Sequence, residues 1–163
     1  MDEASHLRRE PKLSIRTLGT DDSKELHRLY MTNVAQLKQL GLHEEKVPMQ
    51  QQISQVLSAK EGADLFGIFE QHKLIGVVHV KQDAVEKRTA EIGRVIDFAH
   101  QNKGIGGKAL MMVMDALSGR YDHFFAITGE DNILARKSLE KIGFLLESAV
   151  TDDTPNVLYT WHR

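Results

Sequence analysis

A short segment in the second half of the chain, residues 101–108, combines glycines with lysines in a way suited to binding an anion. Its sequence is Gln-Asn-Lys-Gly-Ile-Gly-Gly-Lys, and it follows an apolar stretch that predicts a strand. Glycine has no Cβ atom, so ligand atoms can approach the main chain closely. The first N–H groups of the helix predicted to begin here have no partner within that helix, and with the helix dipole they attract negative charge. The segment therefore predicts a site for a phosphate-bearing cofactor; packing of a glycine-rich helix start is the alternative.

Two other phosphate-binding patterns fit this segment less well. The nucleoside-triphosphate loop requires a glycine where the chain has Asn102 and a hydroxyl residue where it has Ala109, so it fails twice. The dinucleotide pattern Gly-x-Gly-x-x-Gly/Ala is matched by Gly104, Gly106 and Ala109. However, Ala99 to Lys103 separate these glycines from the preceding strand, and too little chain remains for a complete two-half nucleotide-binding fold. A dinucleotide-binding oxidoreductase remains an alternative.

Alternating and helical hydrophobic patterns predict the elements that position this turn. Strands are predicted over Leu13 to Leu18, Asp64 to Glu70, Leu74 to Val80, Thr89 to Asp97, the buried stretch His123 to Thr128, Phe144 to Val150 and Val157 to Trp161. Helices are predicted from Thr20–Asp22 to Gly41, around Ile53 to Leu57, over the largely buried stretch Ile105 to Leu117 with Met111, Met112 and Met114 in the core, and from Asp131 or Asn132 to Ile142, with Gly143 after its end. The order β-α-α-β-β-β-α-β-α-β-β predicts an α/β fold with a mixed sheet.

Composition limits the class of protein. The 163 residues suit one domain, which we place at residues 12–163 after a flexible lead-in from Met1 to Pro11. A formal net charge of −2 without a long basic run argues against nucleic acid as a partner, and no apolar run is long enough to span a membrane. The absence of cysteine excludes disulfides and thiolate chemistry. The scattered histidines lack the spacing of a helical metal site, so we expect no metal, and we expect a cytoplasmic location.

The anion-binding segment also fits a family motif. Gln101 to Gly106 matches the pattern Gln/Arg-x-x-Gly-x-Gly/Ala of the GNAT acetyltransferase superfamily. A second signature of that family is an Asn that begins a helix, an Ala three residues on, and a Gly-Phe pair at its end; Asn132, Ala135 and Gly143-Phe144 occupy these positions. The motifs occur in the family order, and the elements predicted from about residue 12 onward resemble the family fold.

The resemblance implies an enzyme that transfers an acetyl group from acetyl-CoA to a primary amine. It implies that N–H groups from Lys103 to Lys108 hold the CoA diphosphate and that backbone groups of Val95 to Asp97 bind the pantetheine arm and orient the thioester. It also implies that the strand from His123 diverges from the preceding one and leaves a slot. The residues implied to bind the cofactor are Val95, Ile96, Asp97, Gln101, Asn102, Lys103, Gly104, Ile105, Gly106, Gly107, Lys108, Asn132 and Ala135.

Two residues on the predicted strands are candidates for the base that removes a proton from the attacking ammonium group. Glu91 lies four residues before Val95, where several family members carry a base. Its alternative is a solvated glutamate, or one paired with Arg88 or Arg94. His79, on the neighbouring strand, is the second candidate, with a structural role as its alternative.

The general acid used by many family members is missing. They carry a Tyr seven residues after the Asn, where this chain has Leu139, and the sequence does not assign the role to Ser138, Tyr121 or Tyr159. A non-catalytic domain that senses acetyl-CoA is therefore a further alternative. The acceptor is expected to be a small-molecule or peptide amine, and the resemblance implies that the loop from Leu37 to Ile53 and the last strands shape its site. Glu44 and Glu45 in that loop would attract a cationic amine, with solvated acids as the alternative. Family members are often homodimers.

Overall fold

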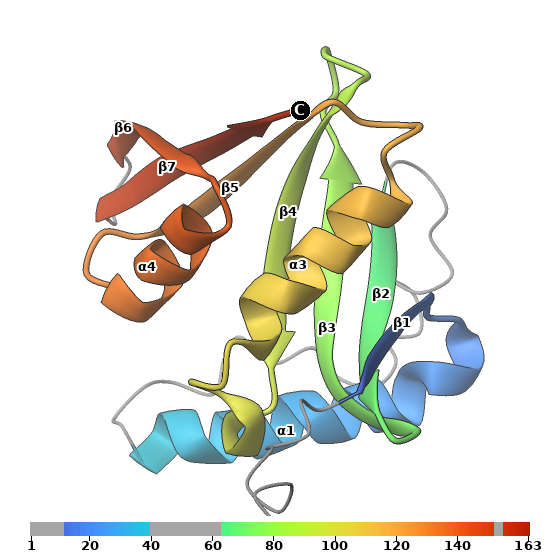
Figure 1. Ribbon diagram of the computed structural model, residues 1–163. Coiled ribbons are helices and arrows are strands. Elements are labelled where there is room, and N and C mark those ends of the chain that lie inside the picture. The colour runs from blue at the N-terminus through green and yellow to red at the C-terminus, as the bar shows by residue number, and fades with distance from the viewer. Residues whose placement is uncertain (1–11, 40–62, 152–154) are drawn as a thin grey trace, which may run out of the picture.

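The computed structural model describes residues 12–39, 63–151 and 155–163, which form a seven-stranded mixed sheet with helices on both faces (Figure 1). The strand order is β1-β2-β3-β4-β5-β7-β6, and neighbouring strands are antiparallel except β4 and β5, which are parallel. In chain order the elements are β1 (Leu13–Thr17), a 3-10 helix (Thr20–Asp22), α1 (Ser23–Gln39), β2 (Ala63–Glu70), β3 (Lys73–Gln82), β4 (Thr89–Ile96), a 3-10 helix (Phe98–His100), α3 (Ile105–Ala116), β5 (His123–Gly129), α4 (Ile133–Lys141), β6 (Leu145–Thr151) and β7 (Pro155–His162).

The predicted α/β class is confirmed, and each predicted strand is present with small shifts at its ends. The β2–β3 hairpin turns at Gln71 and His72, whose φ angles of 47° and 69° are typical of a two-residue turn of type I′. The helix predicted around Ile53 to Leu57, the pair Glu44-Glu45 and the lead-in from Met1 to Pro11 lie outside the described residues. Within the described ranges, no helix is long and apolar enough to cross a membrane.

Two hydrophobic clusters hold the helices against opposite faces of the sheet. α3 and α4 cover one face, where Leu110 and Leu139 belong to the same cluster as the strand residue Phe124. α1 covers the other face, where Leu29 packs in a separate cluster with Val77 of β3. The sheet is therefore the middle layer, and its central strand β4 has access to both sides.

Alternate residues of β4 serve these two layers. Ile92 and Ile96 belong to the cluster under α3, whereas Val95 packs with the cluster under α1. Because side chains alternate along a strand, Arg94 faces the α3 side and Glu91 faces the α1 side. The two side chains lie on opposite faces of the sheet, so the pairing of Glu91 with Arg94 that the sequence left open does not form.

Two expectations about burial are wrong in part. β5 is buried on one face only, since Ala126 is buried but Ile127 is 44% exposed. Ile127 lies on the face of the sheet that α1 covers, but α1 packs against β3, so no helix among the described residues covers this face of β5. In α3, Met114 is buried as expected, whereas Met111 is 53% exposed. Met111 follows Lys108 by one helical turn and shares its exposed stripe.

α4 begins and ends at the residues predicted from the sequence. The side-chain oxygen of Asn132 accepts a hydrogen bond from the N–H of Ala135 at 3.2 Å, as an N-cap does. Gly143 has a φ of 100°, and the N–H of Phe144 donates to the carbonyl of Leu139 at 3.0 Å. This is the Schellman arrangement, which requires a left-handed residue after the helix and so favours glycine.

Tyr159 ties α4 to β7. Its side chain is fully buried, and its hydroxyl accepts a hydrogen bond from Arg136 Nε at 3.1 Å and donates one to Glu140 Oε1 at 2.7 Å. Both partners are charged, which strengthens the bonds.

Replacing Tyr159 with phenylalanine is expected to lower the free energy of unfolding by about 1 to 2 kcal/mol, because two bonds to charged groups are lost while Arg136 and Glu140 regain water. Urea unfolding followed by circular dichroism measures the change. Tyr121→Phe is the matched control: that ring is also buried, but its hydroxyl accepts a single bond, from Arg120 at 3.1 Å, and its loss should cost less. Equal losses in the two variants would contradict a specific role for Tyr159.

Candidate active site

A groove of about 420 Å³ lies where the end of β4, the start of α3 and the exposed side of α4 meet. The residues that line it are Arg94, Ile96, His100, Gln101, Asn102, Gly104, Ile105, Gly106, Asn132, Leu134, Ala135, Lys137, Ser138 and Lys141. Three of these side chains, Arg94, Lys137 and Lys141, are cationic, and none is a carboxylate. The groove is therefore suited to an anionic ligand.

The start of α3 supplies main-chain donors to this groove. Asn102 and Gly104 have φ angles of 61° and 75°, which turn the chain sharply into the helix. The first helical bond runs from the N–H of Lys108 to the carbonyl of Gly104 at 3.2 Å, and no side chain caps the helix. The N–H groups from Ile105 to Gly107 therefore lack partners within the helix, and they point toward its amino end. A turn with this alternation of backbone conformation forms an anion-binding concavity.

The neighbouring glycines of this turn have different roles. A Cβ atom on Gly106 would come within 2.5 Å of Arg94 Nε, so only glycine lets that side chain cross the start of α3. A Cβ atom on Gly107 would lie 3.3 Å from Ser138 Oγ, and Gly107 is buried, so it allows α3 to pack closely against α4. Packing, considered as the alternative to anion binding, thus accounts for Gly107.

One edge of β4 has no strand partner over its second half. β4 pairs with β5 only from Thr89 to Glu91, after which the two strands separate (Figure 1). On its other edge β4 pairs with β3 along its length, and the N–H of Asp97 continues that ladder at 2.8 Å. Bonded residues alternate in an antiparallel pair, so Val95 and Asp97 direct their main-chain groups toward β3. Arg94 and Ile96 direct theirs into the opening.

This geometry changes the roles implied for three strand residues. Ile96 lines the groove, but Asp97 does not fit a contact with the pantetheine arm, because its N–H is bonded to β3 and its side chain is buried. By the same alternation, the main-chain groups of Val95 face β3 and not the opening. Arg94, which the sequence suggested only as an ion-pair partner of Glu91, has main-chain groups that face the opening instead.

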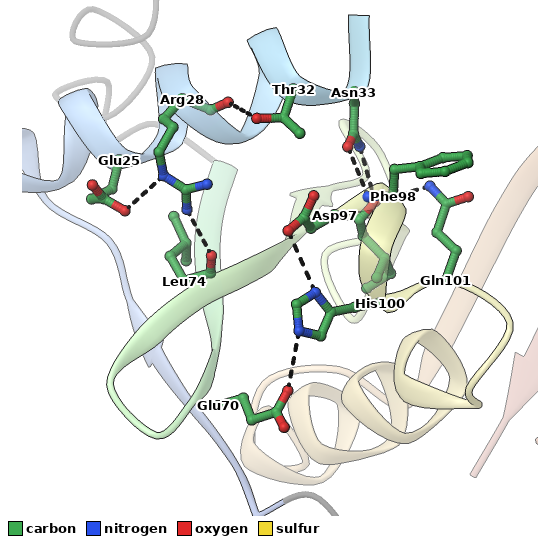
Figure 2. Close-up of polar contacts among 11 residues, drawn as sticks. Glu25, Arg28, Thr32, Asn33, Glu70, Leu74, Asp97, Phe98, His100 and Gln101 are labelled. Carbon is green, nitrogen blue, oxygen red and sulfur yellow. Dashed lines mark hydrogen bonds and ion pairs between the residues drawn. The ribbon is translucent and has the colours of Figure 1, made fainter. Parts of the chain in front are cut away.

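Asn33 of α1 holds the turn from the opposite side of the sheet, as Figure 2 shows. Its amide nitrogen donates to the carbonyl of Ile96 at 2.9 Å, and its amide oxygen accepts from the N–H of Phe98 at 3.0 Å. The side chain thus replaces a neighbouring strand just where β4 ends. Gln101 Nε2 donates to the same carbonyl of Ile96 at 3.0 Å, so this family-motif residue acts by shaping the turn.

His100 lies between two carboxylates at the base of this turn (Figure 2). Its Nε2 is 3.3 Å from Glu70 Oε2, and its Nδ1 is 3.4 Å from Asp97 Oδ2. Asp97 Oδ1 and His100 Nδ1 are buried and make no hydrogen bond within the described part of the chain. The contact links the end of β2 to the turn, and it places an imidazole on the groove wall.

α4 forms the opposite wall of the groove. Asn132, Ala135 and Ser138 line it, whereas Leu139, which stands in place of the family tyrosine, is buried in the core. Asn132 uses its amide oxygen as the helix cap, which leaves its amide nitrogen as the donor available to a ligand. The hydroxyl of Tyr159 is engaged with α4, so it does not take the role of the missing acid.

Glu91 and His79 lie together on the face of the sheet opposite this groove. His79 pairs across the strands with Gly93, and its ring occupies the space where a Cβ atom of Gly93 would lie. Although the side chain as a whole is exposed, loss of water around the ring lowers the pKa of His79, and the charge of Glu91 opposes this shift. The imidazole is therefore neutral at pH 7 and can accept a proton. Glu91 is half-buried at the last paired position of β4, where the opening begins.

The structure thus gathers most, but not all, of the residues implied to bind the cofactor. Ile96, Gln101, Asn102, Gly104, Ile105, Gly106, Asn132 and Ala135 line the groove; Val95, Asp97, Lys103, Gly107 and Lys108 do not. The sequence-based analysis missed Arg94, Asn33 and His100 as parts of the site. The alternation of side chains along β4 could have placed Arg94 on the same face of the sheet as Ile92 and Ile96. Asn33 carried no signal, because its contacts join residues more than 60 positions apart. Among the described residues, no three His, Asp or Glu side chains are grouped as a metal site requires.

A mixed sheet that opens between two parallel strands, with an anion-binding turn at the opening, defines the acyl-CoA N-acyltransferase class of fold. A family model described as an acetyltransferase (GNAT) domain matches residues 12–145. The chain belongs to this family, and it is an N-acetyltransferase that uses acetyl-CoA as its donor. The dinucleotide-binding alternative is therefore wrong, and the non-catalytic alternative is set aside.

Individual relatives agree with this assignment. The chain is 29% identical to the ribosomal-protein-serine acetyltransferase of Escherichia coli (strain K12), with 82% of this chain and 86% of that protein covered. Its fold is similar to that of RimL, a ribosomal L7/L12 alpha-N-protein acetyltransferase solved in complex with coenzyme A (TM-score 0.81, 20% identity, 94% of this chain and 95% of that chain). It is also similar to the microcin C7 self immunity acetyltransferase MccE in complex with acetyl-CoA and AMP (TM-score 0.78, 19% identity, 94% of each chain).

Replacing Asn33 with alanine is expected to weaken CoA binding about three- to tenfold, because the turn loses two hydrogen bonds of roughly 1 kcal/mol each and part of its fixed geometry. Calorimetric titration with CoA measures this. Thr32→Ala is the control, since Thr32 bonds only the helix carbonyl of Arg28 and is exposed. If Asn33→Ala lowered the melting temperature while leaving the Kd for CoA unchanged, Asn33 would support the fold alone.

Proposed function

We propose that this enzyme acetylates the α-amino group at the N-terminus of a protein or peptide. The observation that carries the proposal is the similarity, over most of both chains, to a ribosomal-protein-serine acetyltransferase. RimL, whose fold is similar, is described as an alpha-N-protein acetyltransferase. A small-molecule amine is the other acceptor class, since the structurally similar proteins include an aminoglycoside acetyltransferase in complex with coenzyme A (TM-score 0.76, 16% identity, 93% of this chain and 95% of that chain).

The groove fits CoA in charge and in donors. The N–H groups of Ile105 and Gly106 would bind the diphosphate, because they lack partners in the helix and belong to a groove whose described lining residues include no carboxylate. Lys137 and Lys141 stand at the exposed rim on α4 and would meet the 3′-phosphate. Arg136 does not share this role, because its guanidinium is bonded to Tyr159 and to the carbonyl of Glu130.

The free edge of β4 would bind the rest of the donor. The main-chain groups of Arg94 and of Ile96 face the opening, and the carbonyl of Ile96 is already bonded to Asn33 and Gln101. An amide N–H on this edge is the group that can stabilise negative charge on an acetyl carbonyl. Acetyl-CoA supplies the activated thioester; the chain supplies the alignment that brings it beside the amine.

An α-amine suits the bases that the site offers. Its pKa is about 7.7 to 8.0, against about 10.4 for a lysine side chain, so removing its proton near neutral pH costs little free energy. Glu91 lies at the apex of the opening, on the side away from the cofactor groove, where an amine would reach the thioester through the sheet. We assign Glu91 as the base, acting directly or through water, with His79 beside it.

None of Leu139, Tyr159 and Tyr121 is placed to act as the general acid. Leu139 is buried, Tyr159 is bonded to α4, and Tyr121 lies in the core with its hydroxyl bonded to Arg120. The thiolate would therefore leave unassisted or take its proton from water.

The enzyme is expected to acetylate a peptide that begins with serine, because the α-amine is the most easily deprotonated primary amine on it. Mass spectrometry after incubation with acetyl-CoA locates the added group. The matched control is the same peptide with a blocked N-terminus and an internal lysine, which should remain unmodified. Acetylation of the lysine, or turnover with an aminoglycoside and none with either peptide, would contradict the proposed acceptor class.

Replacing Glu91 with glutamine is expected to lower kcat about 10²- to 10⁴-fold, the usual contribution of a positioned base, and to leave the Kd for CoA unchanged. His79→Gln is the comparison and should cost less than about tenfold, because His79 lies on β3, one strand away from the opening that β4 borders. If His79 were the base, kcat would fall as the pH dropped below about 6.5, where the imidazole becomes protonated. This decrease would be absent in His79→Gln, and Glu91→Gln would stay active. That result would reverse the assignment.

A further inference from the structure

Arg94 is an arginine on the groove wall that has no partner among the described residues. It is half-buried, and it makes no hydrogen bond or ion pair with any residue that the structure describes. The other arginines in the described ranges each have one: Arg16 with Asp22, Arg28 with Glu25, Arg88 with Asp122, Arg120 with Asp64, Arg136 with Tyr159 and Arg163 with the carbonyl of Met114.

The surroundings of Arg94 favour an anion as its partner. Loss of water around the guanidinium lowers the pKa of Arg94, although an arginine stays charged at any physiological pH. Its Nε and Cδ lie beside Gly106, in the first turn of α3, where the helix dipole is also positive. Arg94 and the start of α3 are thus two positive features that face one groove, and none of the described residues lining it is a carboxylate. A partly desolvated charge of this kind is costly unless an anion compensates it.

We propose that the Arg94 guanidinium binds the diphosphate of CoA from the β4 side, opposite the N–H groups of α3. This inference rests on the proposed placement of CoA along the start of α3. A guanidinium donates two parallel hydrogen bonds to phosphate oxygens, which fixes orientation as well as charge. The neutral pantetheine arm offers no such partner, and the lysines of α4 stand at the far wall of the groove.

Arg94 would also set the choice of donor. The N–H groups of α3 reach the diphosphate from one side, and a guanidinium from β4 would add donors to its phosphate oxygens from the other side. The enzyme should therefore favour a CoA thioester over a pantetheine thioester that lacks the diphosphate. Gly106 is needed for the same arrangement, because a side chain at this position would displace Arg94 from the start of α3.

The test measures binding of CoA, dephospho-CoA and pantetheine by calorimetric titration to the wild-type protein and to Arg94→Met and Arg94→Lys variants. Arg94→Met is expected to weaken CoA and dephospho-CoA alike, by about ten- to hundredfold, and to leave pantetheine binding unchanged. Arg94→Lys, which keeps the positive charge but lacks the two parallel donors of a guanidinium, should recover part of the lost affinity. Arg88→Met, an exposed arginine paired with Asp122 just before β4, is the control and should bind CoA as the wild type does.

Each other outcome overturns a defined part of the assignment. Wild-type protein that binds no CoA would overturn the proposed function itself. Wild-type binding with no loss in Arg94→Met, or an equal loss for pantetheine, would overturn the role of Arg94 alone. The melting temperature of the ligand-free Arg94→Met protein should equal or exceed that of the wild type, because an uncompensated charge has been removed; a lower value would mark Arg94 as a structural residue.

Discussion

The separation of β4 from β5 after Glu91 is the constraint on which the site depends. One edge of β4 is bonded to β3 along the strand, whereas its other edge pairs with β5 only as far as Glu91. The main-chain groups of Arg94 and Ile96 on that edge need partners that the sheet does not supply. Parallel strands that diverge at their carboxyl ends also bring the following loop, the turn into α3, to the mouth of the same opening. The free edge and the anion-binding turn thus arise from one break in the sheet.

Local sequence patterns were sufficient for the elements and for the turn. Alternating apolar residues marked the strands, and Asn132 and Gly143 marked the ends of α4, because caps and left-handed residues are local requirements. The turn was found for the same reason: Gly104 has a φ of 75°. What a local pattern could not separate was the purpose of each glycine. Gly106 makes room for a side chain from β4, and Gly107 makes room for α4.

Contacts between distant residues account for what the sequence-based analysis missed. Asn33 is an ordinary polar residue of an amphipathic helix until the fold places it beside the end of β4. Val95 and Asp97 direct their main-chain groups toward β3, because three consecutive residues cannot all face one edge of a strand. The exposure of Ile127 likewise depends on which strand α1 covers. Composition and periodicity carry no information about such long-range choices.

The two faces of the sheet offer different charges to the two substrates. Arg94, Lys137, Lys141 and the start of α3 make the cofactor groove positive, which suits a diphosphate and repels an ammonium group. An acceptor amine carries that positive charge until it loses a proton, so it is poorly placed on the same side. Glu91 and His79 lie across the sheet, where, in the proposed mechanism, one carboxylate and one neutral imidazole would favour an arriving cation and then accept its proton. The break beyond Glu91 is the point at which a thioester held on the positive side and an amine held on the other can meet, so the catalytic geometry and the charge separation follow from the same opening.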